Sequence, residues 1–187
     1  MKCGSCSGIG VGLIVGLAVV LTASQGAVAQ LVPFKASGAG AEYDPATGAY
    51  EGPGTGTHLG KCLFIGTVDL AKLTPLPLPD DDPAVFFRAA FCGFHSYVAA
   101  NGDVLAGDFT GEVSLSVFDL TDPDKFATGR WDASFVVDQA SSTGRFANAS
   151  GEVDLVAINP PFDPTADVYP FYWVADGELD LGKKAGN

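Results

Sequence analysis

Apolar and polar residues alternate along residues 131–158, and this pattern constrains the fold more than any other feature of the chain. The odd positions of both arms are apolar and most even ones are polar, with Val136, Val156 and Ile158 as exceptions. Side chains of a β-strand point alternately to its two faces, so a period of two indicates one buried face and one largely wet face. We therefore expect two strands joined by a tight connection through the segment 141–151.

Further β-prone runs occupy residues 32–37, 57–69, 85–98, 104–118 and 168–181. Asn101 and Gly102 form a hairpin signal between two of them, and the proline-rich segments 73–83 and 159–164 indicate loops. After residue 30 no segment keeps an apolar period of 3.6 residues. These patterns predict an all-β fold, an antiparallel barrel of about eight strands, because closure removes exposed sheet edges. A β-sandwich is the alternative.

The N-terminal residues 1–29 have the pattern of a secretory signal peptide. Lys2 precedes an apolar run at 9–22, and Ala27-Val28-Ala29 supplies a small-residue cleavage site. A retained membrane anchor is the alternative, since the run approaches the length of a membrane span. We expect a mature secreted protein, extracellular or periplasmic, that begins at Gln30.

The remaining chain has room for one ordinary domain. We divide it into a glycine-rich N-terminal segment, 30–56, with room for a first strand at 32–37, a barrel domain at 57–181, and a frayed tail at 182–187. The segment Gly52-Pro-Gly-Thr-Gly-Thr lacks the Gly-Lys-Ser/Thr ending of a phosphate-binding loop and is interpreted as loop or strand-edge glycine.

The chain is strongly acidic, with a formal net charge of -12 that becomes -13 when Lys2 leaves with the signal peptide, because residues 1–29 carry no acid. Such a surface repels nucleic acid and anionic lipid. We expect no nucleic-acid partner and no stable membrane insertion after signal removal. The oligomeric state is left open by the sequence.

Two cysteines, Cys62 and Cys92, remain in the mature chain. An even number in an oxidising compartment predicts one disulfide, which would close a loop of about thirty residues and stabilise the fold by roughly 3 to 4 kcal/mol. Two buried free thiols are the alternative.

Recognisable catalytic and metal motifs are missing from the sequence. The chain has two histidines, which makes a zinc site improbable once the cysteines pair, and it has no Gly-x-Ser-x-Gly turn. The adjacent acids Asp80, Asp81 and Asp82 lack the alternate spacing of a calcium loop, so we interpret them as a solvated acidic tip. Carboxylate pairs for glycoside hydrolysis arise easily by chance in so acidic a chain. We predict no cofactor and no metal, and the sequence leaves open whether the protein is an enzyme.

Aromatic and polar residues share the predicted interior face. If odd positions point inward, a pocket for an apolar or aromatic ligand can form there, with two polar groups to orient it. The alternatives are a packed core, in which a carbonyl satisfies His95, and a register slip at Gly93 that turns His95 outward. The candidate ligand-binding residues are His95, Tyr97, Trp131, Phe135 and Trp173.

The connection 143–151, Thr-Gly-Arg-Phe-Ala-Asn-Ala-Ser-Gly, resembles the T-G-x-F-x-x-A-x-G turn of the allene oxide cyclase and dirigent-like β-barrels. Ser141 and Ser142 stand where those families usually have two glycines. The structural residues of this turn are Thr143, Gly144, Phe146 and Gly151, with Phe146 expected to plug one end of the barrel. The resemblance implies an eight-stranded antiparallel barrel that binds hydrophobic substrates, or guides cyclisation or coupling of reactive intermediates, without a metal or organic cofactor. It carries over no catalytic residue.

The expected function is a non-catalytic binding or surface-interaction module with a small apolar ligand. The alternative that the resemblance implies is a cofactor-free isomerase or cyclase, or a protein that guides coupling. Sequence patterns alone do not decide between them.

Overall fold

A computed structural model describes residues 30–44, 46–119, 121–122, 126–163 and 165–182. The predicted signal peptide and residues 183–187 of the predicted tail lie outside these ranges. No helix in the described part of the chain is long and apolar enough to cross a membrane.

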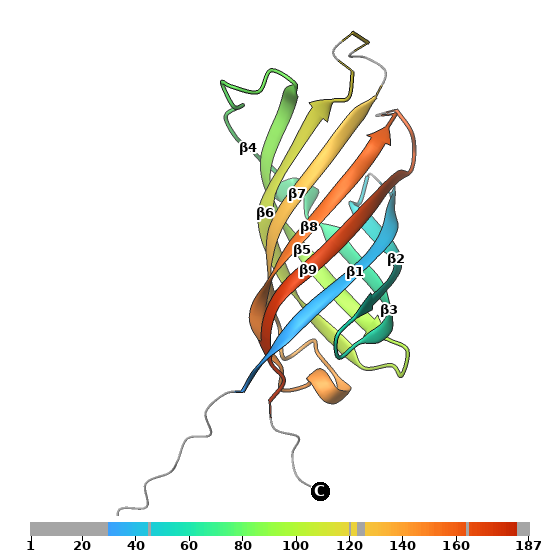
Figure 1. Cartoon of the computed structure of the whole chain (residues 1–187), viewed down its shortest axis with the longest axis vertical. Helices are drawn as coiled ribbons and strands as arrows, with labels where there is room; N and C mark the ends of the chain where they lie inside the picture. Colours follow the sequence, from blue (N-terminus) through green and yellow to red (C-terminus); the bar gives the residue numbers. More distant parts are fainter. Residues whose placement is uncertain (1–29, 45, 120, 123–125, 164, 183–187) are drawn as a thin grey trace, which may run out of the picture.

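Eight antiparallel strands close into a barrel, and a ninth short strand lies on its outside (Figure 1). The strand order is β3-β2-β1-β9-β8-β7-β6-β5, with β3 pairing with β5 to close the barrel and β4 pairing with β5 on the outside. The predicted barrel is confirmed, and this closure excludes the sandwich. The strands are β1 (Leu31–Asp44), β2 (Ala49–Gly56), β3 (Gly60–Val68), β4 (Thr74–Pro75), β5 (Val85–Ala99), β6 (Val104–Val117), β7 (Ala127–Val137), β8 (Ser150–Phe162) and β9 (Tyr169–Asp180).

The barrel begins at Leu31, so the predicted boundary at residue 57 is wrong. Strands β1 and β2 are full members of the barrel, and β1 pairs with β9 from Leu31 to Glu42. The sequence hides β2 because glycine and proline fill its centre, at Gly52, Pro53 and Gly54. A Cβ atom on Gly52 would lie 2.2 Å from the carbonyl oxygen of Ala39. Glycine therefore lets β1 and β2 approach each other closely.

On β5 to β9 the odd-numbered residues face the interior, as predicted. On β5, His95 and Tyr97 have no exposed surface while the intervening Ser96 is half-buried, so the chain passes Gly93 without a register slip. On β7 and β9, Phe135 and Trp173 are likewise buried. Side chains from every barrel strand thus point into the interior.

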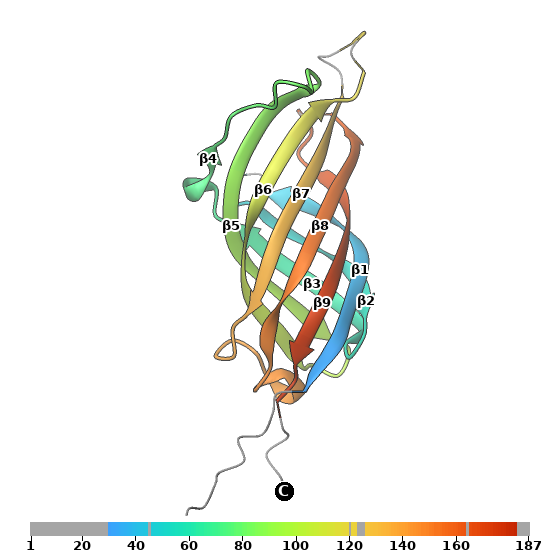
Figure 2. The same cartoon turned by 60° about the vertical axis from the view of Figure 1, so that its left-hand side comes forward.

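One end of the barrel is closed by the connection between β7 and β8, which contains the short 3₁₀ helix η2 (Gly144–Phe146) and lies beneath the strands in Figure 2. Phe146 has no exposed surface and belongs to the main hydrophobic cluster. Gly144 has a φ of 60°, which favours glycine. The amide of Thr143 donates to the carbonyl of Val104 (2.8 Å), and the Arg145 guanidinium pairs with Asp103 (2.8 Å). These contacts anchor Phe146 as the plug of this closed end.

The prediction of a Cys62–Cys92 disulfide is wrong, because both thiols are free. Cys62 faces the interior from β3 and is paired in register with Ala99 on β5. Cys92 lies seven residues before Ala99 (99 − 92), which is about 23 Å along a strand. It also lies on the outward-facing parity of β5. A disulfide needs Cα atoms about 4.4–6.8 Å apart, so strand register separates two residues that sequence spacing suggested as partners.

Candidate functional site

A cavity occupies the barrel interior at the end opposite η2, where β1 and β8 end and β2 and β9 begin. Its volume is about 60 Å³ for the centre of a water-sized sphere, several times what one water molecule needs. Six of the twelve lining residues are aromatic. The lining comprises Glu42, Tyr50, Phe64, Val68, Phe91, Phe109, Trp131, Ala133, Leu155, Ala157, Asn159 and Phe171. An apolar cavity with few polar groups is typical of small-molecule sites.

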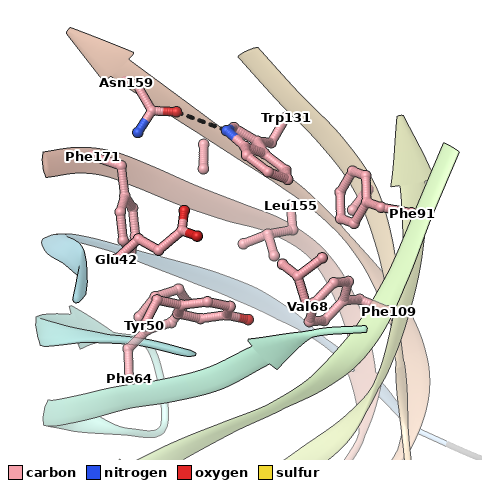
Figure 3. Close-up of a pocket in the computed structure, with 12 residues that line it drawn as sticks. Glu42, Tyr50, Phe64, Val68, Phe91, Phe109, Trp131, Leu155, Asn159 and Phe171 are labelled. Atoms are coloured by element: carbon pink, nitrogen blue, oxygen red, sulfur yellow. Dashed lines mark hydrogen bonds between the residues drawn. The ribbon is translucent and has the colours of Figure 1, made fainter. Parts of the chain in front are cut away.

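Glu42 supplies the single formal charge of the lining. It lies on the inward-facing parity of β1, directly across from Tyr50 on β2, and its carboxylate points into the cavity in Figure 3. Among the described residues no hydrogen bond or ion pair to this carboxylate occurs. Burial raises the pKa of Glu42 above its usual value. The cavity therefore contains a half-buried acid that has no counter-ion within the described part of the chain.

Asn159 orients the aromatic wall at the rim. Its side-chain oxygen accepts a hydrogen bond from the indole nitrogen of Trp131 (2.7 Å), and its amide nitrogen donates to the carbonyl of Pro170 (2.9 Å). Figure 3 shows the first of these bonds as a dashed line. Because both ends of the Asn159 amide are engaged, its role is to fix the Trp131 ring against the cavity.

The floor of the cavity is a packed aromatic layer. The Tyr50 hydroxyl and Nδ1 of His95 share a hydrogen bond at 3.2 Å, and the rings of Phe64 and His95 lie edge to face with centroids 4.1 Å apart. Full burial lowers the pKa of His95 from 6.5 to about 3, so the imidazole is neutral at physiological pH. Tyr50 thus connects the cavity to a neutral histidine beneath it.

Three buried polar atoms below this floor have no hydrogen-bond partner among the described residues: Nε2 of His95, the hydroxyl of Tyr97 and Nε1 of Trp173. Each lies in an apolar, ring-filled environment, with Tyr97 packed against His95 and Trp173. A buried polar group left unpaired costs about 1–3 kcal/mol. The three unpaired groups in this layer therefore lower the stability of the folded protein.

The substitution Tyr97→Phe should leave the free energy of unfolding unchanged or raise it by about 1 kcal/mol, because it removes an unpaired hydroxyl and keeps the ring. The matched control is Tyr50→Phe, which breaks the bond to His95 and should cost about 1 kcal/mol. Urea unfolding followed by fluorescence measures both. A loss above about 1 kcal/mol for Tyr97→Phe would show that this hydroxyl bonds to something in solution, such as water.

The five ligand-binding residues proposed from the sequence all lie inside the barrel, but they do not lie together around the cavity. Trp131 lines it, whereas His95, Tyr97, Phe135 and Trp173 are not among the lining residues and are fully or almost fully buried. His95 bonds to Tyr50 and not to a carbonyl.

Sequence reasoning missed Glu42, Tyr50 and Asn159. Glu42 does carry a signal, because it has the same parity as the buried Phe34 and Ala36 and is an acid in an inward series. Tyr50 lies in the glycine-rich segment where no strand was expected, and Asn159 was assigned to a loop.

Neither a protein-family model nor a curated protein or a solved structure matches the chain. Within the described ranges, no group of three or more histidine, cysteine or acidic side chains is placed to hold a metal ion. The fold and the cavity are therefore the features that bear on function: a closed antiparallel barrel, plugged at one end, with an aromatic cavity at the other.

Proposed function

We propose that this protein is a secreted, non-catalytic binding module that holds a small apolar or aromatic ligand in the cavity of the barrel. The observation that carries the proposal is the contrast between the two ends of the interior. One end is sealed by Phe146, while the other contains a cavity walled by six aromatic side chains. Binding is favourable here, because a ligand that displaces water from apolar surface of this kind lowers the free energy.

The size of the cavity limits the ligand. A volume of this order accommodates one ring with a short chain, and a long acyl chain would have to displace the Tyr50, Phe64 and Phe109 floor. Phenethyl alcohol, a neutral aromatic ring with a short polar chain, is therefore a suitable probe.

The chain has two tryptophans, one on the cavity wall and one in the packed layer below, so their indole N–H signals report binding separately. Titration with phenethyl alcohol should shift the Trp131 signal in a proton–nitrogen correlation spectrum more than the Trp173 signal. The variant Trp131→Phe assigns the two signals. Equal, negligible shifts at saturating probe would argue against a ligand cavity.

Filling the cavity should weaken this binding. The substitution Ala157→Leu adds three carbons to the lining of β8, and we expect at least a tenfold loss of affinity, about 1.4 kcal/mol, without loss of stability. Ala39→Leu is the matched control, since Ala39 faces outward from β1. Isothermal titration with phenethyl alcohol, with melting curves for both variants, makes the comparison. Undiminished binding by folded Ala157→Leu would place the ligand elsewhere.

Secretion is tested by mass spectrometry of the protein recovered from the medium or the periplasm of its source. A mass that begins at Gln30 supports the proposed location, and the same native spectra would reveal a retained ligand. A protein that keeps residues 1–29 would favour the membrane-anchored alternative.

A second candidate function, a cofactor-free isomerase or cyclase, is favoured by Glu42 and Tyr50 facing one cavity. Burial raises the pKa of Glu42 above its usual value, which is the direction that suits a general base, and Tyr50 is bonded to a neutral histidine. Glu42 and Tyr50 line the cavity and are therefore placed to move a proton on a ligand, whereas His95 and Tyr97 do not line it.

Deuterium exchange separates the two functions. A proton-transfer site should accelerate the exchange of α-hydrogens of phenylacetone in D₂O, and Glu42→Gln should remove that acceleration. A pure binding module leaves the exchange at the rate of the probe in buffer.

A further inference from the structure

The Glu42 carboxylate faces an apolar cavity, and no charged partner for it occurs in the ranges that the structure describes. The remaining lining residues of the cavity are neutral, and no lysine or arginine is among them. All ion pairs of the described residues lie elsewhere, between exposed or half-exposed groups. A half-buried charge without a counter-ion raises the free energy of the unliganded barrel.

Aromatic side chains lie beside this carboxylate in the cavity (Figure 3). Tyr50 is its direct cross-strand partner on β2, and Phe171 on β9 is in register with Gly40, the preceding inward position of β1. The rings of Tyr50, Phe64 and Phe171 pack against one another with centroids 5.1–5.8 Å apart. Aromatic faces attract cations, and the attraction is strongest where water is excluded. A carboxylate beside such rings is complementary to an organic ammonium ion.

The charge of the whole chain acts in the same direction. The formal net charge of -12 attracts cations toward the barrel and repels anions. A ligand carboxylate or phosphate would meet Glu42 without a compensating guanidinium or ammonium group. A metal ion needs several oxygen ligands, and the cavity offers one carboxylate.

We propose that the cavity selects a small organic ammonium ion, with its apolar body among the aromatic rings and its charged nitrogen on Glu42. This inference rests on the proposed ligand-binding function and specifies the charge of the ligand. Fatty acids and other organic anions are excluded as ligands.

Three probes of nearly equal size test the proposal: phenethylammonium, phenethyl alcohol and phenylacetate. Isothermal titration should give an affinity for the ammonium ion at least tenfold above that for the alcohol, with phenylacetate the weakest. In Glu42→Gln the ratio of ammonium to alcohol affinity should fall below about twofold. Removal of a charge from an apolar site should not impair folding, and melting curves verify this.

The matched control is Glu51→Gln. Glu51 precedes the inward-facing Gly52 on β2 and is exposed on the outer face of the barrel. Its substitution removes the same unit of charge as Glu42→Gln. The ammonium preference should survive in this variant, which separates a direct contact from long-range attraction.

The outcomes distinguish this inference from the function on which it rests. If the alcohol binds and the ammonium ion binds no tighter, the charge selection is wrong and the apolar cavity stands. A preference that persists in Glu42→Gln would assign it to the general acidic field and overturn the role of Glu42. If no probe binds to the native protein, the proposed ligand-binding function fails as well.

Discussion

Replacing Phe146 by alanine should destabilise the protein by about 3–5 kcal/mol, the usual cost of removing a fully buried phenylalanine side chain. Domains of this kind are stable by about 5–15 kcal/mol, so the change would remove a large fraction of the total. The reason is geometric, because Phe146 fills the closed end from a short connection. The neighbouring strands are held in the sheet by their backbone hydrogen bonds and cannot move inward to fill the space that Phe146 would leave.

Urea unfolding monitored by far-ultraviolet circular dichroism measures this effect. The control is Phe118→Ala, because the Phe118 side chain is 57% exposed beyond the end of β6 and should change stability by less than about 0.5 kcal/mol. A loss below about 1 kcal/mol for Phe146→Ala would mean that the closed end repacks without its plug.

The second large effect is a loss of stability in mild acid, caused by His95. Its pKa is 6.5 in an unfolded chain and about 3 in the folded barrel. Between these two pH values His95 binds a proton in the unfolded chain but not in the folded barrel, so the free energy of unfolding falls as the pH falls. The slope approaches about 1.4 kcal/mol per pH unit across this window. This stability is fully present above pH 6.5.

Urea midpoints between pH 7 and pH 4.5 measure the slope. His95→Phe, combined with Tyr50→Phe so that no hydroxyl loses its partner, should flatten the curve in this range. Removal of the exposed His58 by His58→Asn should leave the slope in place; asparagine suits the positive φ of 64° there. Hydrogen-bonded or ion-paired carboxylates such as Asp103 and Asp138 have lowered pKa values and add their own loss only below about pH 4. Burial raises the pKa of Glu42, so its titration changes stability in the opposite direction to that of His95. The slope is therefore measured in the Glu42→Gln background, where a flat curve above pH 4.5 would contradict a neutral buried His95.

Local patterns predicted most of the fold. The alternation along β7 and β8 and the Asn101-Gly102 hairpin depend on neighbouring residues, which the sequence displays directly. Strand β2 could not be recognised, because Gly52 and Pro53 are poor strand residues; Gly52 is accepted here because β1 approaches it closely. The disulfide failed for a different reason, since only the register between β3 and β5 reveals that Cys62 and Cys92 lie far apart.

The aromatic character of the interior could be predicted from the sequence, but the location of the cavity within the barrel could not. Parity correctly placed His95 and Trp131 on the interior face, yet parity cannot tell a packed layer from a cavity. That distinction depends on which ring sizes meet across the barrel, where Ala133 and Ala157 leave room beside Trp131 while Trp173 fills its layer. The inward orientation of Glu42 becomes evident only when β1 is known to extend to Asp44.

The two ends of the described barrel meet far from the cavity. Leu31 is the register partner of Asp180, and both lie at the end that η2 closes (Figure 1). A support, a fluorophore or a fused domain joined to either end would lie away from the cavity at the opposite end of the barrel. The same proximity allows the ends to be linked and new ones opened in the connection between β5 and β6. The barrel is thus suited to circular permutation and to immobilised sensing of the proposed ligand.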